Sequence, residues 1–116
     1  MQFSLQMGHV NSCSSEKYWN QYVKGSQKPV LVYFYLSYSG RSEQFYTDVA
    51  DLARKHPNVN FFKVDVELLK SIAKAYDVNG TACVLLMPNE NKELVVRGKF
   101  SKMDKEELEK FLKSHL

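Results

Sequence analysis

The chain has 116 residues and a mass of 13.5 kDa, which is the size of one small domain. Apolar residues make up 44% of it and can fill one core, and the formal net charge of +3 comes from 16 basic and 13 acidic residues spread along the sequence. The sequence has no dense run of basic residues, so it does not indicate nucleic-acid binding. We expect a single domain over residues 1–116.

No segment has the pattern of an export signal or a membrane anchor. Residues 1–10 are too polar for a signal peptide, and the longest apolar run, Val30–Leu36, is far shorter than the ~20 residues of a membrane-spanning helix. The two cysteines, Cys13 and Cys83, form no metal-ligand spacing, and low cysteine use fits a reducing compartment. We expect a cytoplasmic protein without a metal or another cofactor and without a membrane contact.

The first quarter of the sequence predicts a weak strand and a short helix. The strand is expected within residues 2–10, and a helix over residues 15–24 follows it. The helix is expected to be buried through Tyr18, Trp19 and Tyr22. Cys13 lies in a polar run before this helix, and the polarity predicts an exposed thiol.

The middle of the sequence alternates strands with helices. Residues 30–36 are almost continuously apolar, which predicts a central strand covered on both faces. A helix over residues 41–56, a strand over 58–64 and a helix over 68–76 follow. Apolar residues recur at helical spacing and predict the buried faces of the two helices. These residues are Phe45, Val49, Leu52 and Ala53 in the first helix and Leu69, Ile72, Ala73 and Tyr76 in the second.

The last third predicts a hairpin and a helix. Strands over residues 81–87 and 93–100 are joined by a turn at 88–91, and the capping signature Ser101–Asp104 precedes the final helix. That helix is expected to pack through Leu108, Phe111, Leu112 and Leu116. The complete order of elements is β-α-β-α-β-α-β-β-α.

The segment from Val30 to Ser42 resembles the active-site segment of the thioredoxin family. The sequence Ser39-Gly40-Arg41-Ser42 stands where that family has its dithiol motif Cys-x-x-Cys. The likeness implies an α/β thioredoxin fold, in which a central mixed β-sheet is flanked by helices on both faces.

The resemblance also defines what the motif lacks. In working thioredoxins the first cysteine lies at a helix N-terminus, which lowers its pKa and makes it a nucleophilic thiolate. The second cysteine then releases the mixed disulfide. Because Ser39 and Ser42 supply neither sulfur, we expect this degenerate motif to be catalytically silent and the chain to have no disulfide reductase activity.

Other functional positions of the family also differ in this sequence. They are the buried acid, the Trp before the motif, the helix-kinking Pro, the cis-Pro and the Gly before the last helix. The matching residues are Tyr33, Tyr38, Thr47, Ala82 and Lys102. A cis bond without proline costs ~2.5–4 kcal/mol, so we expect the bond before Ala82 to be trans.

What remains at the motif is a helix N-terminus with one cation. Outward-pointing backbone amides and Arg41 favour an anionic group there. Alternatively, Arg41 is a solvated side chain and Ser39 an ordinary N-cap. The three histidines, His9, His56 and His115, suggest no metal site and no general base.

Two classes of function stay open. The first is a redox-inactive, non-catalytic module that binds a partner protein through the former active-site groove. The residues expected to line that groove are Tyr38, Ser39, Arg41, Thr81, Ala82 and Cys83.

The alternative is a thiol–disulfide oxidoreductase or a glutathione-handling protein of the thioredoxin superfamily. It would act through the single thiol of Cys83 or through Ser39, or it would be a Cys-to-Ser variant of an active enzyme. A small-molecule thiol would then be a ligand. For Cys83 a purely structural role in the core also remains open.

Overall fold

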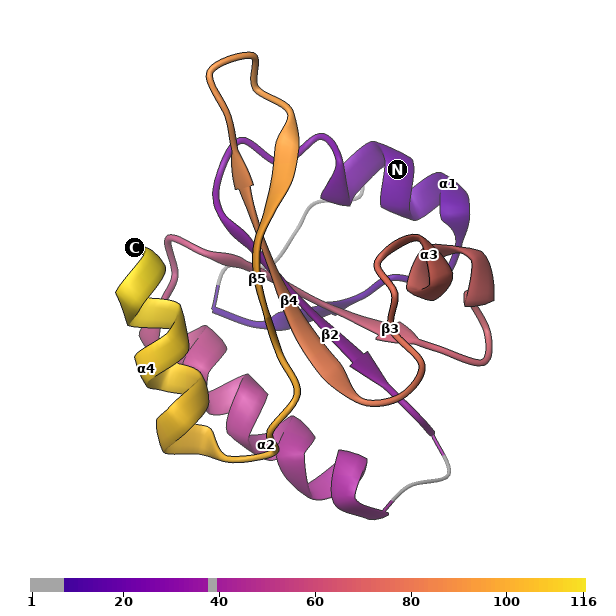
Figure 1. Ribbon diagram of the computed structural model, residues 1–116, viewed down its shortest axis with the longest axis vertical. Helices are drawn as coiled ribbons and strands as arrows, with labels where there is room; N and C mark the ends of the chain where they lie inside the picture. Colours follow the sequence, from indigo (N-terminus) through magenta and orange to yellow (C-terminus); the bar gives the residue numbers. More distant parts are fainter. Residues whose placement is uncertain (1–7, 38–39) are drawn as a thin grey trace.

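The computed structural model describes residues 8–37 and 40–116, with the backbone alone for Arg41, and its centre is a five-stranded sheet (Figure 1). The strands are ordered β1-β3-β2-β4-β5. In chain order the elements are β1 (Val10–Ser12), α1 (Glu16–Tyr18), η1 (Trp19–Val23), β2 (Val30–Tyr35), α2 (Gly40–Lys55), β3 (Asn60–Asp65), α3 (Lys70–Ala75), β4 (Ala82–Pro88), β5 (Leu94–Phe100) and α4 (Lys105–His115).

The sheet is mixed, as the resemblance to the thioredoxin family implies. β3 runs parallel to both β1 and β2, whereas β4 is antiparallel to β2 and to β5. Tyr33 of β2 is paired with Cys83 of β4, and Phe34 is paired with Ala82. The end of β2 therefore lies beside the start of β4, and at this end of the two strands the first turn of α2 contacts the residue before β4.

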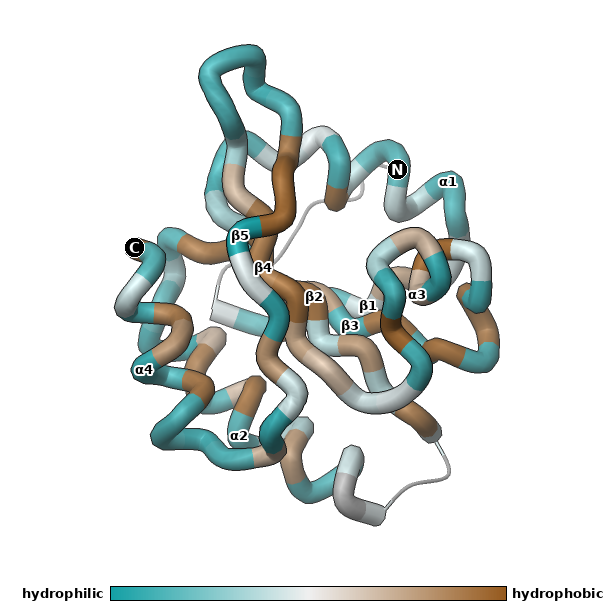
Figure 2. The backbone as a smooth tube through the Cα atoms, in the orientation of Figure 1, coloured by the Kyte–Doolittle hydropathy of each residue, from teal (hydrophilic) through white to brown (hydrophobic). Residues whose placement is uncertain are grey.

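Helices cover both faces of the sheet. α2 and α4 lie together on one face, and α1, η1 and α3 lie on the other (Figure 1). Figure 2 shows the apolar stretches concentrated in the central strands, while the tip of the β4–β5 hairpin is hydrophilic. Because β2 is covered on both sides, five of its six residues are buried. Such two-sided burial accounts for its nearly continuous apolar sequence.

The predicted order of elements is confirmed, and so are most of the buried helix faces. The first strand, β1, begins only at Val10, the last residue of the range predicted for it, and residues 2–7 of that range lie outside the described residues. All four residues predicted to be buried in α2 have exposed fractions of 3% or less. In and beside α3, Leu69, Ile72 and Ala73 are buried, whereas Tyr76 is half-buried. Helical periodicity therefore identified the core side of these helices.

The first predicted helix divides into a short α-helix and a π-helix. The amide of Lys24 donates to the carbonyl of Trp19 at 3.0 Å, five residues back, which is the π-helical pattern. This wider turn buries Trp19 and Val23, whereas Tyr18 and Tyr22 are only half-buried. The buried face was thus predicted correctly only for Trp19.

The prediction of an exposed Cys13 is wrong. Its amide donates to the carbonyl of Lys63 at 3.0 Å, which continues the pairing of β1 with β3 beyond Ser12. This pairing carries the side chain into the core, where its exposed fraction is 4%. The polar neighbours of Cys13 did not signal the burial, because the partner strand is distant in sequence.

The start of α4 also differs from the prediction. Asp104 is the N-cap, and its carboxylate accepts from the amide of Glu107 at 3.0 Å. Ser101 lies outside the helix and is exposed. At the other end, Leu116 is 55% exposed and does not belong to the buried face, which is formed by Leu108 and Leu112.

Replacing Asp104 with alanine should lower the free energy of unfolding by about 1 kcal/mol, the usual cost of losing an N-cap side chain. Urea denaturation at neutral pH measures this change. Ser101→Ala is the matched control and should leave stability within about 0.5 kcal/mol of the original, as for surface substitutions. Equal losses in both variants would show that Asp104 is not the cap.

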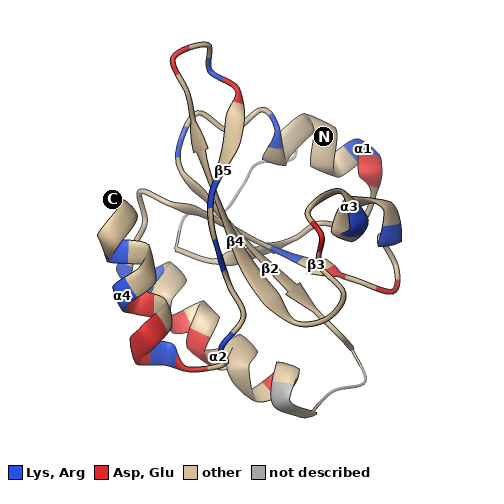
Figure 3. Cartoon of the chain, in the orientation of Figure 1, with Lys and Arg blue, Asp and Glu red and all other residues tan. Residues whose placement is uncertain are grey.

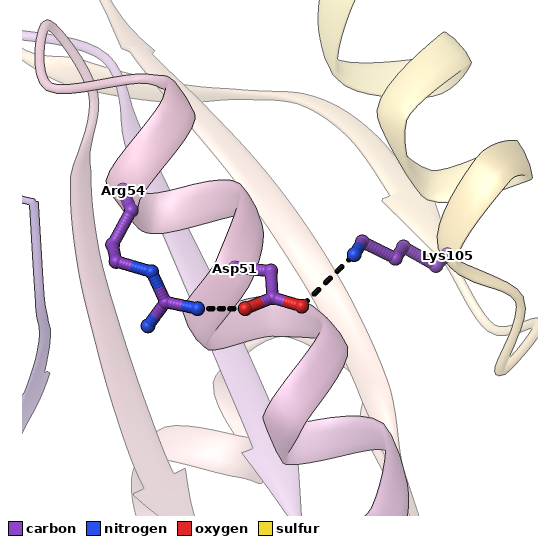
Figure 4. A network of polar contacts seen from close by, with 3 residues as sticks. All are labelled: Asp51, Arg54 and Lys105. Atoms are coloured by element: carbon purple, nitrogen blue, oxygen red, sulfur yellow. Dashed lines mark hydrogen bonds and ion pairs between the residues drawn. The ribbon is translucent and has the colours of Figure 1, made fainter.

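A polar network joins α2 to α4. The two carboxylate oxygens of Asp51 contact Arg54 of the same helix and Lys105 of α4, where Nζ lies 2.9 Å from Oδ2 (Figure 4). A second pair joins the same helices further along, with His56 Nε2 3.4 Å from Glu109 Oε2. Figure 3 shows that charges are dense along the outside of α4. The Asp51–Lys105 and His56–Glu109 pairs link the two segments at their surface, while the buried apolar side chains dock both helices on the sheet.

Within residues 8–37 and 40–116, no helix is both long enough and apolar enough to cross a membrane. Over the same residues, His, Cys, Asp and Glu side chains form no group of three or more that could hold a metal ion.

Candidate functional site

The candidate site lies where β2 leads into α2. β2 ends at Tyr35 and α2 begins at Gly40, which is exposed. Tyr38 and Ser39 lie outside the described residues, as does the side chain of Arg41. Residues 40–42 of the motif therefore lie in the first turn of α2, as the resemblance implies, and the free backbone amides of this turn give it a partial positive charge.

Ser42 is the best-defined residue of the motif. Its exposed fraction is 3%, and its Oγ lies 2.7 Å from Oγ1 of Thr81, in the loop before β4. The carbonyl of Ser42 accepts a hydrogen bond from the hydroxyl of Tyr33 in β2 at 2.7 Å. The first turn of α2 is thus held to β2 and to the β4 loop by contacts that sequence reasoning missed.

The loop before β4 has the trans peptide bond that the sequence predicts. Among the described residues no peptide bond is cis, so the Thr81-Ala82 bond is trans and this expectation is confirmed. Thr81 is half-buried beside Ser42, and the exposed fraction of Ala82 is 7%. Cys83 follows with an exposed fraction of 0%, so its side chain lies in the core and offers no contact to a partner.

Tyr33 occupies the interior, as expected from its place in β2. Its exposed fraction is 1%, and its ring meets the ring of Phe45 edge-on at 5.8 Å between centroids. Burial disfavours the phenolate and raises the pKa of Tyr33 to about 12, against a smaller lowering effect of the Ser42 side chain. Tyr33 therefore stays neutral and acts as a hydrogen-bond donor at neutral pH.

Neither thiol is suited to nucleophilic attack. Burial raises the pKa of Cys83 far above its ordinary value. It also raises the pKa of Cys13, against a smaller lowering effect of a backbone hydrogen bond with Ser15. A reactive cysteine needs exposure and a lowered pKa. The geometry therefore favours the structural role of Cys83 over the single-thiol mechanism.

Beside the motif is a cavity of about 260 Å³, and three of the eight residues that line it are tyrosines. Tyr33, Tyr35 and Tyr46 form its aromatic wall, and Nζ of Lys63 lies 4.6 Å from the centre of the Tyr46 ring. Alternation along β2 places residues 33 and 35 on the same face. The shared face of Tyr33 and Tyr35 could therefore be predicted from the sequence. That Tyr46 and Lys63 also line the cavity depends on the tertiary structure.

The bond between Ser42 and Thr81 can be measured by a double-mutant cycle. Ser42→Ala and Thr81→Val should each destabilise the protein, and the coupling between them should be about 1 kcal/mol, the usual net contribution of one hydrogen bond. Urea unfolding of the two single variants and the double variant gives the coupling. A coupling near zero would mean that the two hydroxyls do not interact in solution.

A mixed sheet of this order, with a helix N-terminus after β2 facing the loop before β4, defines a protein of the thioredoxin fold class. The thioredoxin family profile matches residues 10–114. The chain belongs to the thioredoxin family.

Curated relatives and solved structures agree with this assignment. The chain is 32% identical to thioredoxin H-type 1 of Nicotiana tabacum over 97% of its length and 88% of the relative. It is 30% identical to thioredoxin H1 of Arabidopsis thaliana over 94% of its length and 95% of the relative. A poplar thioredoxin h is 20% identical and superposes with a TM-score of 0.78, covering 91% of this chain and 95% of that one.

The expectation of a redox-inactive adaptor is contradicted by these relatives. They are named as thioredoxins, and they match almost the whole chain, so they favour the oxidoreductase alternative. The adaptor hypothesis rested mainly on Ser39 and Ser42, whereas the relatives match the chain over almost its whole length. Another structure with the same fold, 18% identical to this chain, comes from a complex of ferredoxin:thioredoxin reductase and thioredoxin f2.

Proposed function

We propose that the chain is a thiol–disulfide oxidoreductase of the thioredoxin class in a form that carries serine at both sulfur positions, 39 and 42. The observation that supports this most is the position of Ser42. It lies in the first turn of α2 and bonds to Thr81 of the facing loop. A resolving thiol of a thioredoxin would be held at this point.

The reaction proceeds in two exchange steps. A thiolate at position 39 attacks one sulfur of a substrate disulfide, forms a mixed disulfide and releases the other sulfur as a thiol. The thiol at position 42 then attacks the mixed disulfide, which leaves a disulfide between positions 39 and 42 and frees the second substrate thiol. Because both steps need a sulfur atom at positions 39 and 42, the function is tested in the variant Ser39→Cys/Ser42→Cys.

Substrates of this class are proteins with accessible disulfides. The surface proposed to receive them comprises Tyr38, Ser39, Arg41, Thr81 and Ala82, whereas the buried side chain of Cys83 takes no part. A reducing compartment such as the cytoplasm would keep the dithiol form available. No described observation favours glutathione or another small thiol as the substrate.

Insulin reduction with dithiothreitol tests the proposal. Ser39→Cys/Ser42→Cys should precipitate the insulin B chain faster than the serine form does. The rate should stay below that of an H-type thioredoxin assayed in parallel, because Tyr33 and Ala82 replace residues that the family uses. Ser39→Cys alone is the matched control and should form a mixed disulfide without turnover. A folded double variant no faster than the serine form would refute the proposal.

A further inference from the structure

A second cavity lies on the opposite face of the sheet from α2. Its volume is about 330 Å³, and η1, Tyr76 and the β4–β5 hairpin enclose it. This volume is at the lower end of the ~300–1,000 Å³ range of ligand sites. The cavity shares no lining residue with the motif of positions 39–42, so its chemistry is independent of the proposed redox site.

The floor of this cavity is apolar. Val23 and Leu86 are buried there with exposed fractions of 0% and 1%, and Leu94 of β5 adds a half-buried side chain. The ring of Trp19 lies 5.6 Å from that of Tyr76 between centroids, and both rings line the cavity. The floor therefore suits a small hydrocarbon or aromatic group, whose burial is favourable.

The rim of the cavity is cationic. Lys24 and Lys92 are both exposed at its edge, and no described residue forms an ion pair with either ammonium group. Glu93 is the one acidic residue lining it, so the rim carries a net charge of +1 from two lysines and one glutamate. An anionic group is therefore favoured over a neutral or cationic one.

Local structure holds the backbone at both lysines. The π-turn that closes with the bond from the Lys24 amide to the Trp19 carbonyl places Lys24 one turn after Trp19. In the hairpin, the side-chain oxygen of Asn89 accepts from the amides of Asn91 and Glu93, each at 2.9 Å. The backbone of the rim is therefore ordered before a ligand binds, and only the side chains of the two lysines have to be ordered by it.

We propose that this cavity binds a small amphipathic anion, with its apolar body on the Trp19 and Leu86 floor and its carboxylate or sulfonate between Lys24 and Lys92. The apolar floor and the paired cations at one edge jointly select this class. An uncharged apolar molecule would make no ionic contact with the two lysines. A small ion without an apolar body would bury no apolar surface on the floor.

Trp19 is the only tryptophan of the chain, so its fluorescence reports on this cavity without a label. Titration with 4-phenylbutyrate should change the emission saturably. The neutral 4-phenylbutanol should bind about tenfold more weakly, because it lacks the charge-assisted contacts, and acetate should give no saturable change. Equal affinities for the acid and the alcohol would overturn the proposal, as would the absence of saturation with 4-phenylbutyrate.

Substitutions at the rim test whether 4-phenylbutyrate binds in this cavity. Lys24→Gln/Lys92→Gln should weaken 4-phenylbutyrate binding about tenfold or more, whereas Glu93→Gln should strengthen it. Lys55→Gln removes an exposed cation of α2 outside this cavity and is the matched control, which should bind as the original does. Unchanged affinity in the double lysine variant, with its melting temperature intact, would refute the assignment of the site.

Discussion

Replacing Tyr33 with aspartate, the acid that the thioredoxin resemblance places here, should lower the free energy of unfolding by about 2–4 kcal/mol. The change removes a ring with an exposed fraction of 1% that packs on Phe45, and it removes the hydroxyl that donates to the Ser42 carbonyl. It also buries a carboxyl group that is costly to ionise. Urea unfolding at pH 7 measures the loss.

The loss should depend on pH in a defined direction. Burial raises the pKa of the introduced carboxyl in the folded state above its unfolded value of ~3.9. Folding then favours the protonated form, so the variant should lose further stability as the pH rises from about 4 through the raised folded-state pKa. Tyr33→Phe is the control and should lose only about 1 kcal/mol without that pH dependence. Equal stability of Tyr33→Asp and the original protein would contradict the burial of Tyr33.

Truncating Leu108 to alanine should destabilise the protein by about 2–5 kcal/mol, since a fully buried leucine then leaves a cavity. Leu108 is 0% exposed on the face of α4 that packs toward α2. Leu116→Ala at the end of the same helix is the matched control. Because Leu116 is 55% exposed, its truncation should change stability by less than about 0.5 kcal/mol. Similar losses at both positions would show that α4 is docked differently.

Most of the helices and strands could be predicted from local hydrophobic patterns, because these patterns reflect which side of an element is buried. The helical spacing of Phe45, Val49 and Leu52 identified the inner face of α2, and the unbroken apolar run of β2 identified a central strand. Such periodicities are properties of neighbouring residues. They are visible in one sequence without knowledge of what packs against the element.

Long-range contacts were not predictable in the same way. Cys13 is buried because its backbone continues the pairing with β3, some fifty residues later, although its neighbours are polar. Ser101 and Asp104 are both acceptable caps. Which of them begins α4 depends on how Leu108 docks on the rest of the protein.

The helix that begins at the motif was predicted from the sequence, but the contacts of its first turn were not. α2 begins at Gly40, and the side chain of Ser42 in its first turn contacts Thr81. The hydrogen bond between the side chains of Ser42 and Thr81 spans 39 residues, and the bond from the Tyr33 hydroxyl to the Ser42 carbonyl depends on how α2 lies over β2. Reading the two serines alone led to the adaptor hypothesis, which the thioredoxin relatives contradict.

The central claim is that the start of α2 is a thioredoxin-type thiol site, and the pKa of a thiol introduced by Ser39→Cys tests it most directly. The rate of iodoacetamide alkylation is measured against pH, with the unmodified chain as the blank because Cys13 and Cys83 are buried. We predict a midpoint within about 3.5–7.5, the range for thiols activated at helix N-termini. A midpoint at or above the ordinary value of ~8.5 would contradict the claim.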